Sequence, residues 1–150
     1  MYQVFIDGSC PKNGLEASVG GWAYIITDEY GSTVKQSFGK LRVGPQNSTR
    51  AELESLYRAL LEMQQMGGTY EIITDYKVIV DLVEGFGARK ANRDMWDQIE
   101  PIMLSMAGSI KITHINAHVE SDDIRNTNNN VVDKLARQGA NSLLIAPVPV

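Results

Sequence analysis

The sequence predicts an α/β fold in which helices flank one mixed sheet of five strands. Three strand-like segments follow one another near the N-terminus with short polar connections, which is typical of an antiparallel meander. Beyond them, helical and strand-like segments alternate, and strands joined through helices lie parallel in a sheet. The expected order of elements is therefore βββαβααβα.

The first three strands are expected at residues 2–7, 19–27 and 32–41. Residues that favour strands dominate the first run, and Gly8 and Pro11 end it. Trp22 and Tyr24 share one face of the second strand, because side chains alternate along a strand. A turn at residues 28–31 leads into the third, more polar strand.

A helical period follows the meander. It covers residues 50–66, where apolar side chains recur three and four residues apart. Residues 47–49 offer side chains that cap a helix, and the two glycines at 67–68 end it. Glu54 and Arg58 lie four residues apart on the face opposite the apolar stripe, so we expect a solvated ion pair there.

The second half of the chain continues the alternation. We expect a strand at residues 71–75, helices at 76–84 and around Trp96, a fifth strand at 109–117 and a last helix at 129–143. The polar stretch 119–128 is predicted to be a mobile loop. Residues 1–146 are expected to form a single domain, and Pro147 and Pro149 make the tail at 147–150 non-helical.

The composition, with 43% hydrophobic and 21% charged residues, is that of an ordinary soluble globular protein. No apolar run is long enough to span a bilayer, and no basic segment followed by an apolar one indicates a secretory signal. Cys10 is the single cysteine, which fits a reducing compartment. We therefore expect a cytoplasmic protein without a membrane partner.

The net charge of −4, from 14 basic and 18 acidic side chains, argues mildly against a broad basic surface for nucleic acid. It does not exclude a nucleic-acid enzyme whose acids gather around divalent cations. If four carboxylates were used in that way, the rest of the chain would be neutral.

Four carboxylates occupy positions that suit a site at one edge of the sheet. Asp7 and Asp75 close the first and fourth strands, and the carboxyl ends of parallel strands are the usual place for a site. Glu52 falls on the apolar side of its helix, and Asp133 lies near the start of the last helix. Each also has a simpler interpretation, as a turn residue or as an acid that favours the first turn of a helix.

Four unpaired carboxylates in one place would repel each other, and their pKa values would rise. Divalent cations remove that cost, and oxygen ligands favour Mg²⁺ or Mn²⁺. A pair of such ions about 3.5–4 Å apart suits the hydrolysis of a phosphodiester. With one cysteine and two histidines, the chain has no thiolate-rich zinc site as an alternative.

Five short motifs follow one another along the chain. They are Asp7-Gly-Ser-Cys-x-x-Asn13, Arg50-Ala-Glu52-Leu, Thr74-Asp75, Ala117-His118 and Asn129-x-x-x-Asp133-Lys-Leu-Ala-Arg137. In this order they resemble the motifs of type 1 ribonucleases H, and the resemblance covers residues 2–143. It implies a ribonuclease H-like fold and an endonuclease that cuts the RNA strand of an RNA–DNA hybrid.

The resemblance also implies roles for individual residues. The implied ligands of two Mg²⁺ or Mn²⁺ ions are Asp7, Glu52, Asp75 and Asp133. His118 would assist proton transfer or product release, unless it is an ordinary surface histidine. The positions expected to contact the substrate are Gly8, Ser9, Cys10, Asn13, Ser48, Thr49 and Lys77. Cys10 and Asn13 match positions near the 2′-hydroxyls, the groups that distinguish RNA from DNA.

Three departures from the family pattern bear on substrate binding. Ser48 and Thr49 stand where longer amides are common, and Tyr76-Lys77 replaces a common Ser-Gln or Ser-Asn. The basic stretch at residues 85–93 is short. This predicts weaker binding, because phosphate contacts supply much of the affinity for nucleic acid.

Two other functions remain open: a weakly catalytic module that binds hybrid or RNA, and a DNA nuclease of the resolvase or integrase type. The carboxylates argue against the first, since clustered negative charge does not help a binder. Cys10 and Asn13 favour the ribonuclease over the second. Glu120, Asp122 and Asp123 would either recruit metal or repel phosphate. We expect a monomer, and association with a polymerase stays open.

Overall fold

A computed structural model describes residues 1–10, 19–42, 44–85, 89–117 and 123–141. The elements are β1 (Tyr2–Ser9), β2 (Gly21–Thr27), β3 (Thr33–Lys40), α1 (Ser48–Met66), β4 (Tyr70–Thr74), α2 (Lys77–Glu84), α3 (Arg93–Ser105), β5 (Ile110–His114) and α4 (Ile124–Asn141). This order confirms the predicted succession of strands and helices. The tail predicted at 147–150 lies outside the described residues.

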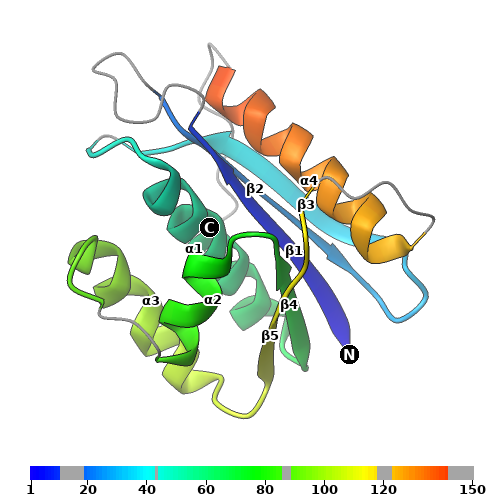
Figure 1. The fold of residues 1–150 in the computed structure, drawn as a ribbon. Helices are drawn as coiled ribbons and strands as arrows, with labels where there is room; N and C mark the ends of the chain where they lie inside the picture. The colour runs from blue at the N-terminus through cyan, green and yellow to red at the C-terminus, as the bar shows by residue number, and fades with distance from the viewer. Residues whose placement is uncertain (11–18, 43, 86–88, 118–122, 142–150) are drawn as a thin grey trace.

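The strands form one mixed sheet in the order β3-β2-β1-β4-β5 (Figure 1). β1 pairs antiparallel with β2, and β2 with β3, which confirms the meander. The β1–β4 and β4–β5 pairs are parallel, as connections through helices require. β1 and β4 are therefore neighbours whose carboxyl ends meet at the same edge.

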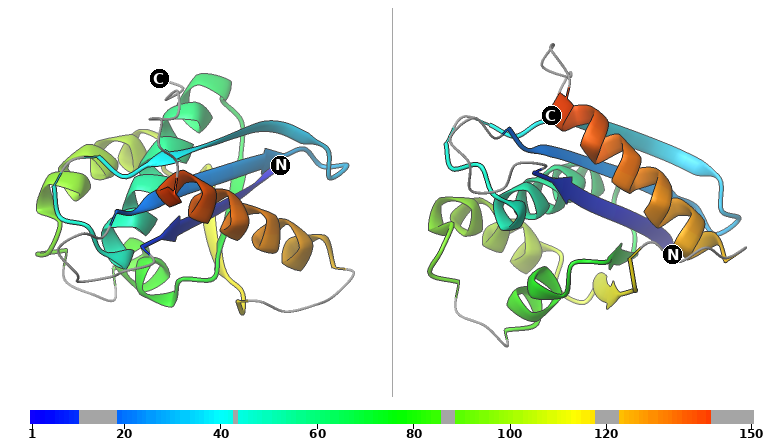
Figure 2. Two further views of the ribbon diagram at one scale, coloured as in Figure 1. Left: turned by 90° about the horizontal axis from the view of Figure 1, so that it is seen from above. Right: turned by 45° about the horizontal axis from the view of Figure 1, so that its top comes forward.

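Helices cover both faces of the sheet (Figure 2). On one face, α1, α2 and α3 enclose the larger core, to which Leu56 and Trp96 belong. On the other face, α4 packs through Ala136 onto a smaller core. α4 can approach β2 closely because β2 begins with Gly21, where a Cβ would collide with the backbone of Ala136 and Ala140.

The carboxyl ends of β1 and β5 differ from the prediction by two and three residues, and strand pairing explains both. β1 continues past Asp7, because β2 pairs with it to its end. Asp7 therefore lies within β1, although it is beyond Phe5, the last residue of β1 that pairs with β4. β5 ends at His114 instead of residue 117, because its partner β4 ends at Thr74.

The last helix begins at Ile124, so the loop predicted at 119–128 is wrong over its second part. Asp123 Oδ1 accepts a hydrogen bond from the Arg125 amide at 2.8 Å, which caps the helix. The Arg125 guanidinium donates to the buried Glu71 carboxylate at 3.1 Å and anchors the first turn to β4. The sequence gives no sign of this turn because its polar residues lack an apolar period.

The ion pair expected to be solvated, Glu54 with Arg58, is buried instead. Glu54 is 0% exposed and accepts hydrogen bonds from Arg58 Nε at 3.3 Å and from Arg42 Nε at 2.6 Å. Arg42 also donates to Gln98 of α3 at 2.9 Å. Helical periodicity identifies the face of α1 that turns from the sheet, but it does not reveal that α3 covers that face.

Glu54→Ala is expected to destabilise the protein by about 3 kcal/mol, because it leaves Arg58 and Arg42 without their carboxylate in a buried site. Urea unfolding followed by circular dichroism measures this loss. Asp81→Ala breaks the exposed pair of Asp81 with Lys77 and is the matched control, with little change expected. A loss as small as that of the control would show that the charge of Glu54 is solvated.

Candidate active site

Asp7 and Glu52 meet where β1 passes the N-terminal part of α1. Gly8 permits this approach, because a Cβ there would collide with the backbone of Ala51 and Glu52. Asp7 is 3% exposed and Glu52 is 2% exposed. The Gly8 amide donates to Asp7 Oδ1 at 3.0 Å and orients that carboxylate. Two acids from separate elements are thus buried next to each other.

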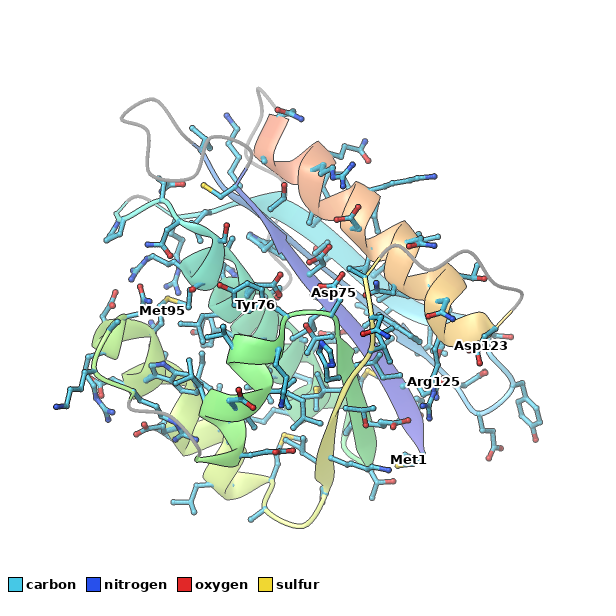
Figure 3. All side chains as sticks on the ribbon, in the orientation of Figure 1. Met1, Asp75, Tyr76, Met95, Asp123 and Arg125 are labelled. Atoms are coloured by element: carbon cyan, nitrogen blue, oxygen red, sulfur yellow. The ribbon has the colours of Figure 1, made fainter. Side chains whose placement is uncertain are left out.

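Asp75 completes a cluster of three carboxylates. It directly follows β4, the parallel neighbour of β1 (Figure 3). One carboxylate oxygen from each of Asp7, Glu52 and Asp75 lies within 4.8 Å of the others. Asp75 Oδ2 accepts a hydrogen bond from Asn129 Nδ2 of α4 at 3.2 Å. Two parallel strands and helices from both faces of the sheet therefore meet at this point.

Asp133 of α4 lies beside the three-carboxylate cluster and is partly buried. Its proximity raises the pKa values of both Asp7 and Glu52. Its Oδ2 is also 2.9 Å from the guanidinium of Arg137, one turn later. The structure thus brings all four predicted carboxylates to one place, with Asp133 outside the tight group of three.

Burial shifts both interior acids toward their neutral forms. The pKa of Asp7 is raised far above its ordinary value, first by burial and then by the charge of Glu52 and the hydrogen bond between them. The pKa of Glu52 is also raised, because burial and the charges of Asp75 and Asp133 outweigh hydrogen bonds from Asp7 and the Gly8 backbone. The pair therefore retains protons unless positive charge is brought to it.

The donor set fits a divalent cation. Among the described residues, Asp7 Oδ2 and Glu52 Oε2 are buried oxygens without a hydrogen-bond donor. Buried oxygens of this kind are rare and costly. A hard cation prefers carboxylate oxygens, and its charge would offset the repulsion within the cluster. The acidic cluster is thus consistent with metal binding.

The residues expected to contact substrate lie on β1 and α1, which carry Asp7 and Glu52, and on α2, which begins two residues after Asp75. In the described part of the chain they are Gly8 and Ser9 in β1, Cys10 directly after it, Ser48 and Thr49 at the start of α1, and Lys77 at the start of α2. Lys77 is exposed and donates to Asp81 at 2.7 Å. Asn13 and His118 lie outside the described residues.

Thr49 is engaged by Tyr76, one of the departures from the family pattern. Their hydroxyl oxygens share a hydrogen bond at 2.7 Å. Tyr76 lies next to Asp75 in the chain (Figure 3), and Thr49 precedes Glu52 on α1. The bond therefore ties together the two segments that carry these carboxylates.

The short basic stretch is occupied by contacts within the protein. Arg89 donates to two backbone carbonyls of α2 and lies over the Trp96 ring, 4.5 Å from its centroid. Arg93 pairs with Asp97 and with Glu100. Arg89 and Arg93 are therefore engaged within the protein, and the weaker binding expected from the sequence stays a prediction.

The RNase H family profile matches residues 1–141, which include all four clustered acids. The chain belongs to the RNase H family. A search of curated proteins finds no match. Within the described residues, no helix combines the length and the apolar character needed to cross a membrane.

Solved structures share the RNase H fold with this chain. LC11-RNase H1 in complex with RNA/DNA hybrid matches with a TM-score of 0.75 and 22% identity, over 94% of this chain and 97% of its own. RNase H1 from the halophilic archaeon Halobacterium salinarum NRC-1 matches with a TM-score of 0.72 and 17% identity, over 92% and 96%.

A viral protein contains the same fold as one part of a longer chain. The foamy viral protease-reverse transcriptase in complex with RNA/DNA hybrid matches with a TM-score of 0.76 and 20% identity. The match covers 93% of this chain and 20% of the viral one. Together these likenesses confirm the ribonuclease H-like fold predicted from the sequence.

Asn129 begins the last of the five motifs, but the family resemblance implies no role for it. In this RNase H protein Asn129 of α4 donates a hydrogen bond to Asp75. Its spacing of four residues from Asp133 was an available signal, because residues four apart share a helix face. The contact itself depends on where α4 crosses the sheet.

In EDTA, the unfolding free energy is expected to fall as pH rises from about 5 toward 9. The folded-state pKa values of Asp7 and Glu52 lie above their ordinary values. The stabilisation that the two acids contribute is therefore complete at pH values below their pKa values in the unfolded chain. It is lost as pH rises through their pKa values in the folded protein. Urea unfolding at a series of pH values measures the slope of the unfolding free energy against pH. Mg²⁺ should reduce this slope.

Asp7→Asn should flatten this slope, because the substitution removes one buried acid with little change of shape. Asp97→Asn, at an exposed position of α3, should leave the slope unchanged. An equal slope in the unmodified protein and in Asp7→Asn would contradict the assignment of the pH dependence to the cluster.

Proposed function

We propose that this RNase H family protein is a metal-dependent endonuclease that hydrolyses the RNA strand of RNA–DNA hybrids. The observation that carries the proposal is the meeting of Asp7, Glu52 and Asp75 within 4.8 Å at the carboxyl end of the parallel strands. The family match supports it. So does the fold shared with LC11-RNase H1 and the foamy viral protease-reverse transcriptase, both solved with RNA/DNA hybrid.

The metal site would consist of Asp7, Glu52, Asp75 and Asp133, holding two ions of Mg²⁺ or Mn²⁺. Bound ions of this kind activate a water and stabilise the leaving oxygen of a phosphodiester. The close approach of β1 and α1 at Gly8 brings Asp7 and Glu52 together. Cation binding would release the protons that burial retains on these two acids. Raised pKa values make cation binding stronger at higher pH.

The substrate would lie across the ends of β1, α1 and α2. The residues proposed to contact it are Gly8, Ser9, Cys10, Asn13, Ser48, Thr49 and Lys77. Cys10 and Asn13 would read the 2′-hydroxyls, which only the RNA strand carries. His118 would transfer a proton or assist product release. Since one chain supplies every ligand of the cluster, we propose that the monomer is active.

A cleavage assay tests the activity directly. Labelled RNA–DNA hybrid, double-stranded RNA, single-stranded RNA and DNA are compared in Mg²⁺ and in EDTA, and cleavage of the hybrid's RNA strand in Mg²⁺ is expected. Asp75→Asn should abolish cleavage because it removes a ligand charge, whereas the surface variant Asp97→Asn should retain it. Cleavage of DNA alone would instead identify a DNA nuclease, and binding without cleavage would identify a binding module.

His118→Ala should slow turnover by roughly 10²-fold, as expected for one acid–base group. Single-turnover and steady-state rates on the hybrid separate the chemical step from product release. His114→Ala, at an exposed position of β5, is the matched control and should retain its rate. Complete inactivity of His118→Ala would mean that His118 has a different role.

A further inference from the structure

Asn129 is a buried amide that faces the carboxylate cluster from α4. It is 2% exposed, and its Nδ2 lies 3.2 Å from Asp75 Oδ2. An ionised carboxylate only accepts hydrogen bonds, so the nitrogen of the amide must point toward Asp75 and the oxygen away from it. The contact therefore has one chemically sensible orientation.

The other end of the amide indicates that Asn129 is not there for stability. Its Oδ1 is buried and accepts no hydrogen bond from the described residues. An unpaired buried acceptor lowers stability, and a leucine of nearly the same shape would avoid that loss. A residue that lowers stability is best explained by a functional role, and the group that Asn129 holds is the Asp75 carboxylate.

The position of Asn129 is itself set by β4. Glu71, Ile73 and Asp75 alternate along this strand and so share the face toward α4. Glu71 pairs with Arg125 at 3.1 Å, and Ile73 lies in the apolar core beneath α4. One turn after Arg125, Asn129 reaches Asp75. Contacts along β4 therefore hold this part of α4 in place.

The Glu71 contact is maintained at neutral pH. Burial alone would raise the pKa of Glu71, but hydrogen bonds from Thr113 and Gln3 and the charges of Arg125 and Lys111 outweigh burial and lower it. Glu71 consequently stays ionised at neutral pH, and its ion pair with Arg125 stays formed.

We propose that Asn129 is a positioning residue, which fixes the orientation of the Asp75 carboxylate for cation binding. The proposal rests on the proposed metal site and deepens it. Asp75 is the least buried of the three clustered acids and follows the end of its strand. A carboxylate at such a place keeps rotational freedom unless a hydrogen bond removes it, and partners of this kind strengthen cation binding.

Asn129→Leu tests the proposal, with Mn²⁺ alone as the probe in titration calorimetry. The Mn²⁺ dissociation constant is expected to rise about tenfold, the lower end of the effect of losing a ligand's hydrogen-bond partner. The melting temperature in EDTA should stay equal or rise. With hybrid as substrate, kcat at fixed Mg²⁺ should fall while KM changes little, and raising Mg²⁺ should recover part of the rate.

Asn141→Leu makes the same substitution at an exposed position of the same helix and should bind Mn²⁺ as the unmodified protein does. Asn129→Ala removes the amide without adding bulk, so it decides the matter if the leucine variant does not fold. Mn²⁺ affinity within twofold of the unmodified value in a folded Asn129 variant would overturn the proposal. So would a weaker affinity that merely follows a lower melting temperature.

The calorimetric result separates this proposal from the proposed function. If the unmodified protein leaves the hybrid uncut but Asn129→Leu still weakens Mn²⁺ binding, the nuclease assignment fails and the role of Asn129 stands. If the unmodified protein cuts the hybrid and Asn129→Leu matches it in Mn²⁺ affinity, the nuclease assignment stands and the role of Asn129 fails.

Discussion

The repulsion between carboxylates at one end of the sheet is the constraint on which the rest of the structure depends. Asp7 and Glu52 are almost fully buried, and Asp75 and Asp133 add negative charge beside them. Such a group would separate if its supports were free to move, and burial keeps protons on Asp7 and Glu52 when no cation is present. The four acids come from separate segments of the chain, and contacts outside the cluster fix the elements of these segments.

The supports differ on the two faces of the sheet. On one face, α1 is fixed against β1 by the close approach at Gly8 and on its far side by the buried Glu54 carboxylate. On the other face, polar contacts from β4 to Arg125 and Asn129 flank an apolar core. These contacts fix the elements, whereas Asp7 Oδ2 and Glu52 Oε2 receive no hydrogen bond from the described residues and are available to a cation.

The side chains around the carboxylate cluster differ from the family pattern, although the fold is shared. Tyr76 links the segment after β4 to Thr49 on α1, and Arg89 is held by α2 and Trp96. Both features use side chains within the protein that could otherwise face a nucleic acid. The carboxylates follow the family motifs, whereas these neighbouring side chains depart from them, so this chain is expected to differ from its relatives in substrate affinity more than in chemistry.

Local patterns in the sequence predicted the order of the elements, the mixed sheet and the four candidate acids. Strand alternation, helical period and short motifs depend only on residues that are close together in the chain. The placement of Asn129 against Asp75, the burial of Glu54 and the first turn of α4 depend on partners far away in the chain. Arg125 lies 54 residues from Glu71, and Arg42 lies 12 residues from Glu54. No local period encodes such contacts, so only the packing of helices on both faces of the sheet decides them.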